Sequence, residues 1–111
     1  MRERMLRLIG ALGFAVLAAT SPTSAQDYGI VVVNGTSTPI EFFYFSECRM
    51  NDWLRDRLGA NEVIRPGQSR HFDMYDGVRD CCRDMRAKFT NGAVRDRMGV
   101  DVCRESEWVV R

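Results

Sequence analysis

The cysteines are the residues of this chain whose type and spacing most clearly suggest chemistry. Cys81 and Cys82 are adjacent, whereas Cys48 and Cys103 stand well apart from them. Metal centres built from cysteine normally use a C-x-x-C spacing, often with histidines. This chain has no such spacing and a single histidine. The pattern therefore predicts disulfide bonds formed in an oxidising compartment, with no metal and no cofactor.

His71 is the natural candidate for a general base, because it is the only histidine. Its neighbours Arg70 and Phe72 suit an outward position on a half-exposed strand, and no serine or free cysteine lies beside it in the sequence to act as a nucleophile. A glycine-rich phosphate loop and an H-E-x-x-H motif are also missing. We therefore expect no catalytic residues and no enzyme activity.

Calcium is a further candidate ligand. Asp73, Asp76 and Asp80, followed by Asp84, cluster around an expected turn at Asp76-Gly77, and hard cations take such oxygen ligands. The spacing is not that of an EF-hand loop, and turn aspartates paired with nearby arginines explain the same residues. We keep Asp73, Asp76 and Asp80 as weak calcium candidates.

The tryptophans could be stacking surfaces for a sugar or a partner protein. Trp53 lies at helical spacing with Leu54 and Leu58, which predicts a place in the core. Trp108, near the terminus in a polar setting, is the more open for contact with a partner.

Residues 1–25 read as a secretory signal peptide. A start rich in arginine precedes an apolar run from Leu8 to Ala19, and Thr23-Ser24-Ala25 offers small residues for cleavage. The apolar run is shorter than the roughly 20 residues of a spanning helix, so we expect no membrane insertion of the mature chain. The mature protein, a single domain over residues 26–111, is expected to be periplasmic or secreted.

Charge argues against a nucleic-acid partner. The formal charge is +1 for the whole chain, and it becomes −1 without residues 1–25, which carry three arginines and one glutamate. The remaining arginines alternate with acidic residues rather than forming the one-sign footprint that nucleic-acid binding needs. We expect a solvated surface of mixed charge.

Most of the mature chain has the pattern of short strands. The runs 30–33 and 40–45 are β-branched and aromatic, and the turn signal Asn34-Gly35 between them predicts a hairpin with a loop over 34–38. The aromatic residues of 40–45 cover both faces, so we expect that strand to be sandwiched on both sides at the centre of the fold. Further strand signals follow at 63–64, 69–74 and 108–110.

Between Cys48 and Gly59 the pattern becomes helical. Asn51 or Asp52 can cap a helix, the leucines at 54 and 58 share one face, and the glycine suits a left-handed stop. We expect one or two helical turns here.

The last hairpin joins 81–90 to 93–103 through Asn91-Gly92, a dipeptide that favours a two-residue type I′ turn. That register pairs Phe89 with Val94, Met85 with Met98, and Cys81 with Val102. These pairs form an apolar face interrupted by Arg83. The opposite, wet face carries Asp84, Arg86, Lys88, Arg95 and Arg97.

Together these elements predict an all-β fold. It is a small antiparallel β-sandwich or barrel of six to seven strands with one short helical turn, held by two disulfides. At this size each disulfide adds stability on the order of 2 to 4 kcal/mol.

The pairing of the cysteines is not settled by the strands alone. Neighbours on a strand point to opposite faces, so Cys81 and Cys82 each need another partner. In the unbulged register Cys103 lies on the same face as Cys82, whereas a bulge at Met98-Gly99 sets it opposite Cys81. Both alternatives stay open.

Several motifs resemble a group of small exported proteobacterial proteins of unassigned function. The resemblance covers most of the mature chain in order. The motifs are W-x-x-D-x-L-G at 53–59, V-x-x-P-G-Q-S at 63–69, C-x-x-D-M-R-A-x-F-x-x-G at 81–92 and G-V-D-V-C at 99–103. In that group the recurrent cysteine is the one at Cys81, with Cys103 as its partner. The resemblance thus favours Cys81 with Cys103 and Cys48 with Cys82, and it implies a fold and a compartment but no activity. The group usually has an aromatic residue where this chain has Arg83.

We therefore expect a non-catalytic binding or structural protein of the cell envelope, with an envelope or extracellular protein as partner. The alternative is a secreted inhibitor of a protease or lysozyme, whose preorganised loop would lose little entropy on docking. The contact surface would then be the segment 47–61, with Arg49, Asn51 and Arg55, joined by Trp108 as a further contact candidate.

Overall fold

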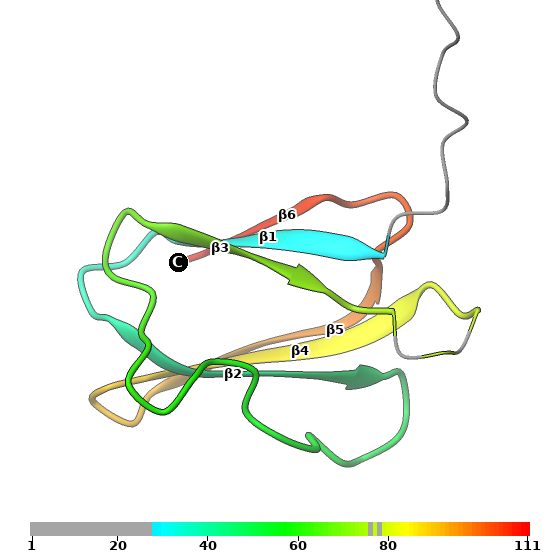
Figure 1. Ribbon diagram of the computed structural model, residues 1–111, viewed down its shortest axis with the longest axis horizontal. Coiled ribbons are helices and arrows are strands. Elements are labelled where there is room, and N and C mark those ends of the chain that lie inside the picture. Colours follow the sequence, from blue (N-terminus) through cyan, green and yellow to red (C-terminus); the bar gives the residue numbers. More distant parts are fainter. Residues whose placement is uncertain (1–27, 76, 78) are drawn as a thin grey trace, which may run out of the picture.

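The computed structural model describes residues 28–75, 77 and 79–111 and places six strands in two sheets that stack face to face (Figure 1). The first sheet has the order β3-β1-β6, with β1 Gly29–Asn34, β3 Ser69–Asp73 and β6 Glu107–Val110. The second has the order β2-β4-β5, with β2 Ile40–Glu47, β4 Cys82–Phe89 and β5 Val94–Asp101. The all-β prediction is confirmed, whereas the expected signal peptide lies outside the described residues.

β1 is the central strand of the first sheet because its β-branched run suits a buried strand. It pairs antiparallel with β3, where Ile30 faces Phe72, and parallel with β6, where Val32 faces Trp108. Ile30 and Val32 are fully buried. The strand signals at 30–33, 69–74 and 108–110 are thus confirmed, but the parallel pairing of β1 with β6 departs from the wholly antiparallel sandwich that was expected.

The expected hairpin between β1 and β2 is wrong, because the two strands belong to different sheets. Asn34 does not turn the chain back on itself. It is fully buried at the point where the chain passes from the first sheet to the second. Its amide donates to the carbonyl oxygens of Thr38 at 2.8 Å and Ile64 at 2.9 Å, and its Oδ1 accepts from the backbone N–H of Thr36 at 2.9 Å. Gly35 follows because a Cβ there would lie 2.8 Å from the Val110 carbonyl oxygen.

β2 supplies the aromatic centre of the core. Phe43 and Phe45 point between the sheets, and the Phe43 ring stacks on Phe72 of β3 with centroids 4.3 Å apart. However, β2 is an edge strand, and Phe42 and Tyr44 on its other face are only half-buried. The strand is therefore covered on one face, contrary to the expectation of two, because no third layer packs on this sheet in the described part of the chain.

The hairpin β4–β5 forms, but with a three-residue loop. The N–H of Gly92 donates to the Phe89 carbonyl at 2.9 Å, and Gly92 alone of the Asn-Gly pair has a positive φ, 86°. This is a type I turn followed by a left-handed glycine, so Lys88 rather than Phe89 pairs with Val94. The predicted register is thus wrong by one residue near the turn.

This one-residue slip moves the side chains of residues 94–98 in β5 to the other face. Val94 and Met98 lie on the outer face and are 39% and 60% exposed. The sequence pattern predicts them on the inner, apolar face, and this prediction is wrong. Arg95 and Arg97 take the inward side of β5 instead. They cover the open side of the sandwich, Arg95 over the Phe89 ring and Arg97 in a salt bridge with Glu105.

The expected bulge at Met98-Gly99 is present. Met85 pairs with Arg97 and Arg83 with Val100, so two residues of β5 face one residue of β4. Gly99 has the positive φ, 65°, that such a bulge favours. The bulge does not set Cys103 opposite Cys81 as expected, because it only offsets the slip at the turn. Cys81 therefore lies opposite Val102, and Cys103 reaches Cys81 from the turn that follows β5.

The disulfides join Cys48 to Cys82 and Cys81 to Cys103, with Cα atoms 5.5 and 5.4 Å apart. This is the pairing that the resemblance favoured. Both bonds lie at one end of the second sheet, one on each of its faces, and such bonds fit an oxidising compartment. Within the described residues, no helix is long and apolar enough to cross a membrane.

Arg83 fills an inward position of β4, and it is fully buried. Its guanidinium donates to the carbonyl oxygens of Met74, Asp80 and Cys82, and it lies 5.9 Å from the Tyr28 ring centroid. The charge is therefore solvated by backbone carbonyls, and it links the segment after β3 to the start of β4.

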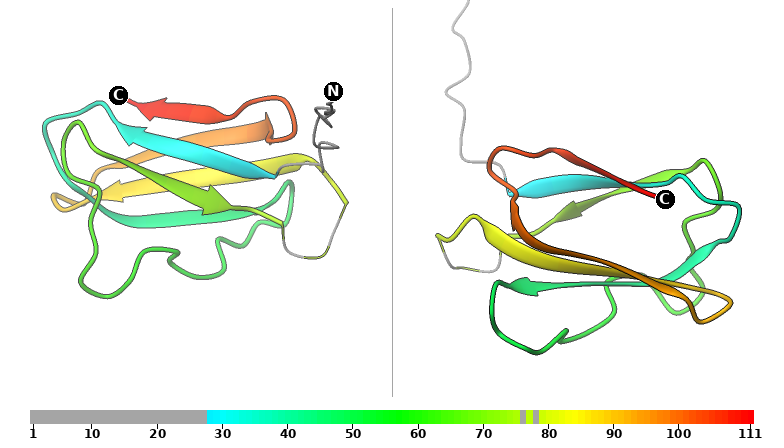
Figure 2. Two further views of the ribbon diagram at one scale, coloured as in Figure 1. Left: turned by 45° about the horizontal axis from the view of Figure 1, so that its top comes forward. Right: turned by 180° about the vertical axis from the view of Figure 1, so that it is seen from behind.

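The helical turns expected between Cys48 and Gly59 are absent. Residues 48–63 form an irregular loop on the far side of β2 (Figures 1 and 2), and Ile64 adds only an isolated bridge to Ile40 where a strand was expected. Leu58 is buried, but Leu54 is 48% exposed. The four-residue spacing of the two leucines therefore does not reflect one helical face.

Candidate functional site

A pocket of about 310 Å³ lies on the outer face of the second sheet, beside the loop 48–63. We call it the outer-face pocket. Its lining residues come from β2, the loop, β4 and β5: Ser46, Asn51, Asp52, Trp53, Asp84, Arg86, Asp96 and Met98. Segments that are distant in sequence therefore meet at one site.

The floor of the pocket is an ion pair between two neighbouring strands. Arg86 of β4 faces Asp96 of β5, and its Nε and one terminal nitrogen each lie 2.7 Å from an Asp96 oxygen. This hydrogen bond raises the pKa of Arg86 above its ordinary value. The guanidinium carbon also lies 4.8 Å from the centroid of the Trp53 ring. The ring, the guanidinium and the carboxylate thus hold one another in place.

Asp84 forms the deeper wall and is only 6% exposed. Its Oδ1 accepts a hydrogen bond from the Gly99 N–H at 2.8 Å, and its Oδ2 accepts one from the Arg49 N–H at 3.2 Å. The carboxylate therefore fixes both the bulge in β5 and the start of the loop. Within the part of the chain that the structure describes, no salt bridge joins it to a cation.

The loop wall is rigidly held although it is irregular. The Cys48–Cys82 bond ties its start to β4, and Arg49, Asn51 and Leu54 have positive φ angles of 68°, 58° and 63°. Non-glycine residues adopt such angles at an energetic cost and need surrounding contacts to keep them. Asp52 supplies one such contact by accepting the Leu54 N–H at 2.9 Å.

The far end of the loop covers the edge of β2. Asp56 accepts the N–H of Phe43 at 3.0 Å, and the Arg57 N–H donates to the Phe43 carbonyl oxygen at 2.7 Å. The Arg57 guanidinium also donates to the Phe45 carbonyl oxygen. These bonds occupy the groups that an added strand would use, so β2 is closed to edge pairing.

An aromatic strip continues from the pocket along the same face. The Phe42 and Tyr44 rings stack with centroids 6.3 Å apart, and the Lys88 ammonium lies 5.7 Å from the Phe42 centroid. Val94 and Met98 add exposed apolar surface from β5. Aromatic residues, methionine and arginine are the types enriched in protein interfaces.

The three contact residues predicted in the loop are all exposed. Asn51 lines the pocket, the backbone of Arg49 is bonded to Asp84, and Arg55 lies farther along the loop. Trp108 is different, since it is 9% exposed and packs near Phe43 with centroids 6.4 Å apart. The expectation that Trp108 contacts a partner is therefore wrong, because β6 turns this ring into the core.

The remaining candidates lie away from the pocket. His71 is exposed on β3 of the other sheet. Asp73 and Asp80 each accept the backbone N–H two residues on, from Tyr75 and Cys82, as turn aspartates do. Asp76 lies outside the described residues.

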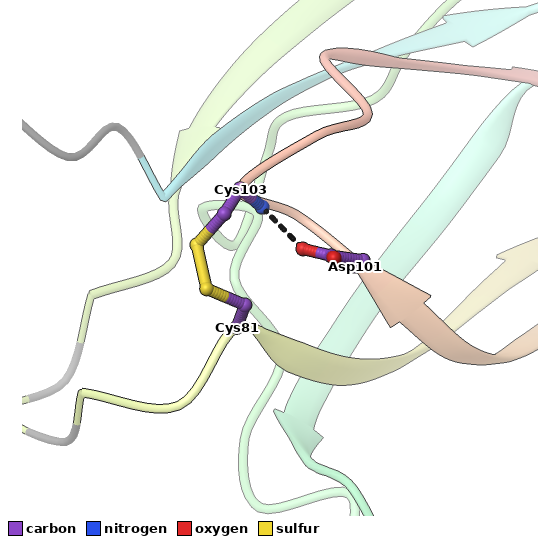
Figure 3. Close-up of side chains that lie close together, drawn as sticks. All are labelled: Cys81, Asp101 and Cys103. Atoms are coloured by element: carbon purple, nitrogen blue, oxygen red, sulfur yellow. Dashed lines mark hydrogen bonds between the residues drawn. A yellow bond between two sulfur atoms is a disulfide. The ribbon is translucent and has the colours of Figure 1, made fainter.

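Among the described residues, one group has the proximity of metal ligands: Cys81, Asp101 and Cys103, with ligand atoms within 4.8 Å of one another. Figure 3 shows that the two sulfurs are bonded to each other and that Asp101 accepts the Cys103 N–H, at 3.0 Å. The group is therefore a covalent and hydrogen-bonded corner, and its sulfurs are not thiolate ligands.

Sequence reasoning did not bring the pocket together. Trp53 had been placed in the core, and Arg86 and Asp96 were ordinary charges on a wet strand. The length of the loop at Asn91-Gly92 was the one signal that could have revealed the ion pair. A three-residue loop, in place of the predicted two-residue loop, places Arg86 directly opposite Asp96.

Comparison with known proteins gives one partial likeness. Over 87 residues the chain is 31% identical to the L-type lectin-domain containing receptor kinase S.1 of Arabidopsis thaliana. The aligned part covers 71% of this chain, and the chain spans 12% of that protein. No family matches the sequence and no solved structure matches it.

Proposed function

We propose that this protein is a non-catalytic binding module of the cell envelope that engages a protein partner through the outer face of the sheet β2-β4-β5. The observation that carries the proposal is the outer-face pocket continued by the aromatic strip. Trp53, Tyr44 and Met98 offer ring and thioether surface beside the fixed Arg86–Asp96 pair. Such preformed anchors concentrate binding energy in small interfaces.

The likeness to a lectin-domain receptor kinase supports a role in recognition. A glycan ligand is the alternative outcome that this likeness suggests, since an exposed indole beside carboxylates can also receive a sugar. The predicted signal peptide and the paired disulfides support an exported location, where either ligand class is present.

Site-directed crosslinking tests the proposed face. A photoreactive aromatic residue in place of Met98, which is 60% exposed, should trap a partner protein when the oxidised protein is exported in its own cells. The same residue in place of His71, exposed on the opposite sheet, should trap far less. Equal trapping at both positions, or trapping from position 71 alone, would refute the proposed face. Trapping of glycan without protein would assign the ligand to the lectin-like alternative.

A second candidate function, inhibition of a hydrolase, is favoured by the loop. The Cys48–Cys82 bond and Asp84 hold a protruding segment whose Arg49, Asn51 and Arg55 are exposed. Alanine at these three positions should abolish inhibition of an envelope protease or a lysozyme, whereas alanine at Met98 should not. A wild-type protein that inhibits neither enzyme class would rule out this candidate.

A further inference from the structure

The charges of the outer-face pocket do not balance. Its walls carry the carboxylates of Asp52, Asp84 and Asp96 against the single guanidinium of Arg86. The Nε and one terminal nitrogen of Arg86 donate to Asp96, and no salt bridge joins Asp52 or Asp84 to a cation among the described residues. The site is therefore electronegative where it is deepest.

The buried position of Asp84 makes its negative charge more effective at attracting a cation than the charge of an exposed aspartate. Asp84 is 6% exposed, so little water reaches its charge, and among the described residues its hydrogen bonds come from the backbone N–H groups of Gly99 and Arg49. These hydrogen bonds satisfy the two carboxylate oxygens but do not neutralise the negative charge, and a cation brought next to a buried charge is attracted more strongly than at the surface. An incoming positive group thus gains from the position of Asp84.

The neutral walls suit the same kind of ligand. The Arg86 guanidinium already lies 4.8 Å from the Trp53 ring centroid, so the ring and the polarisable Met98 side chain are surfaces for an alkyl stem rather than for a second cation. A volume of about 310 Å³ lies at the small end of the range for ligand sites, and it fits one side chain better than a chain of several units.

We propose that the outer-face pocket receives an alkylammonium or guanidinium group, presented as a lysine or arginine side chain by the protein partner. This inference rests on the proposed function and names the chemistry of its anchor. The cation sits between Asp52 and Asp84 with its stem against Trp53, and Arg86 stays paired with Asp96.

Titration of the oxidised protein with small capped amino acids tests the pocket directly. N-acetyl-arginine amide and N-acetyl-lysine amide should shift the Trp53 indole N–H resonance saturably, while the neutral analogue N-acetyl-citrulline amide should not. Equal binding of the citrulline compound, or no saturable shift with either cation, would overturn the proposal. Putrescine binding more than about tenfold tighter than both capped cations would assign the pocket to free polyamines and overturn the side-chain assignment.

A matched pair of variants separates charge from turn geometry. Asp52 and Asp73 are both exposed, and each accepts the N–H two residues on, at 2.9 and 3.0 Å. Asp52→Asn should weaken cation binding about fivefold, whereas Asp73→Asn should leave it within about twofold. Equal effects of the two changes would overturn the proposal.

The outcome is separable from the proposed function. Crosslinking at position 98 that persists while the cations fail to bind would refute only the pocket chemistry. Cation binding without any crosslinked partner would refute the protein-binding face and reduce the site to a small-molecule pocket.

Discussion

The carboxylate of Asp84 accepts a hydrogen bond from the N–H of Gly99 at 2.8 Å, across the bulge that β5 makes opposite β4. The same carboxylate holds the Arg49 N–H, so one residue sets both a strand irregularity and a loop. Asp84→Ala should therefore lower the free energy of unfolding by about 2 kcal/mol, because it leaves these N–H groups without their acceptor.

Denaturant unfolding measures this change, with Asp73→Ala as the control. Asp73 is exposed and bonds a single N–H, so its loss should cost under about 1 kcal/mol. Indistinguishable midpoints for the two variants would contradict the role given to Asp84.

The two Asn-Gly dipeptides should respond very differently to substitution. Asn34→Ala removes a buried amide that donates to two carbonyl groups, and it should cost about 3 kcal/mol. Asn91→Ala removes one exposed acceptor of the Ala93 N–H, and it should cost about 0.5 kcal/mol. Thermal unfolding of both variants checks the ordering, and a larger loss for Asn91→Ala would show that the role of Asn34 is misassigned.

Arg83 should tolerate neither a neutral nor a shorter replacement. Arg83→Met keeps much of the volume but removes the guanidinium donor from the Met74 and Asp80 carbonyl oxygens, so we expect a loss of about 2 kcal/mol or more. Arg83→Lys should recover only part of this, because an ammonium cannot reproduce the planar fork. Full recovery by lysine, measured by denaturant unfolding, would mean that the position needs charge alone.

Glu62 makes stability depend on pH at the acid end. Its hydrogen bond from the Gly59 N–H, followed by its bond to Arg70, lowers the pKa of Glu62 from 4.5. A carboxyl with a lowered pKa in the folded state stabilises above the unfolded value, and it loses that contribution as the pH falls through its folded pKa. Below pH 4.5, Glu62→Gln should therefore show a shallower fall in melting temperature than wild type, and identical slopes would contradict this.

Intact-mass analysis of exported protein tests the signal peptide. We expect the mass of a chain that begins at Gln26. This mass should not change on treatment with a thiol-alkylating reagent, because all four cysteines are paired. Retention of residue 1, or alkylation of any cysteine, would contradict the expected processing or the expected oxidation.

Local patterns predicted the strands well because their signals are local. The β-branched run at Ile30–Val33 and the alternating segment at 69–74 became strands, and Gly99 marked the bulge. Adjacent cysteines had to point to opposite faces, and they do. These features depend on the geometry of a few neighbouring residues.

The pairing of the strands and the position of the pocket could not be predicted in the same way, because both depend on contacts between residues that are distant in sequence. The Asn-Gly signal at 34–35 matches the one at 91–92, yet only the second forms a hairpin, since Asn34 bonds to Ile64 thirty residues away. Trp53 reaches Arg86 only because the Cys48–Cys82 bond and Asp84 place the loop. The spacing of Leu54 and Leu58, which predicted a helix here, holds no information about that contact.

The neighbouring cysteines at the start of β4 also bear on how the disulfides form. Exchange of partners between Cys81 and Cys82 would require β4 to rotate by half a turn, which would expose Met85 and Ala87 to water and bury Arg86. Burial of the apolar face of β4 therefore favours the native disulfide pairing over the exchanged one. An isomer with exchanged partners would expose apolar surface.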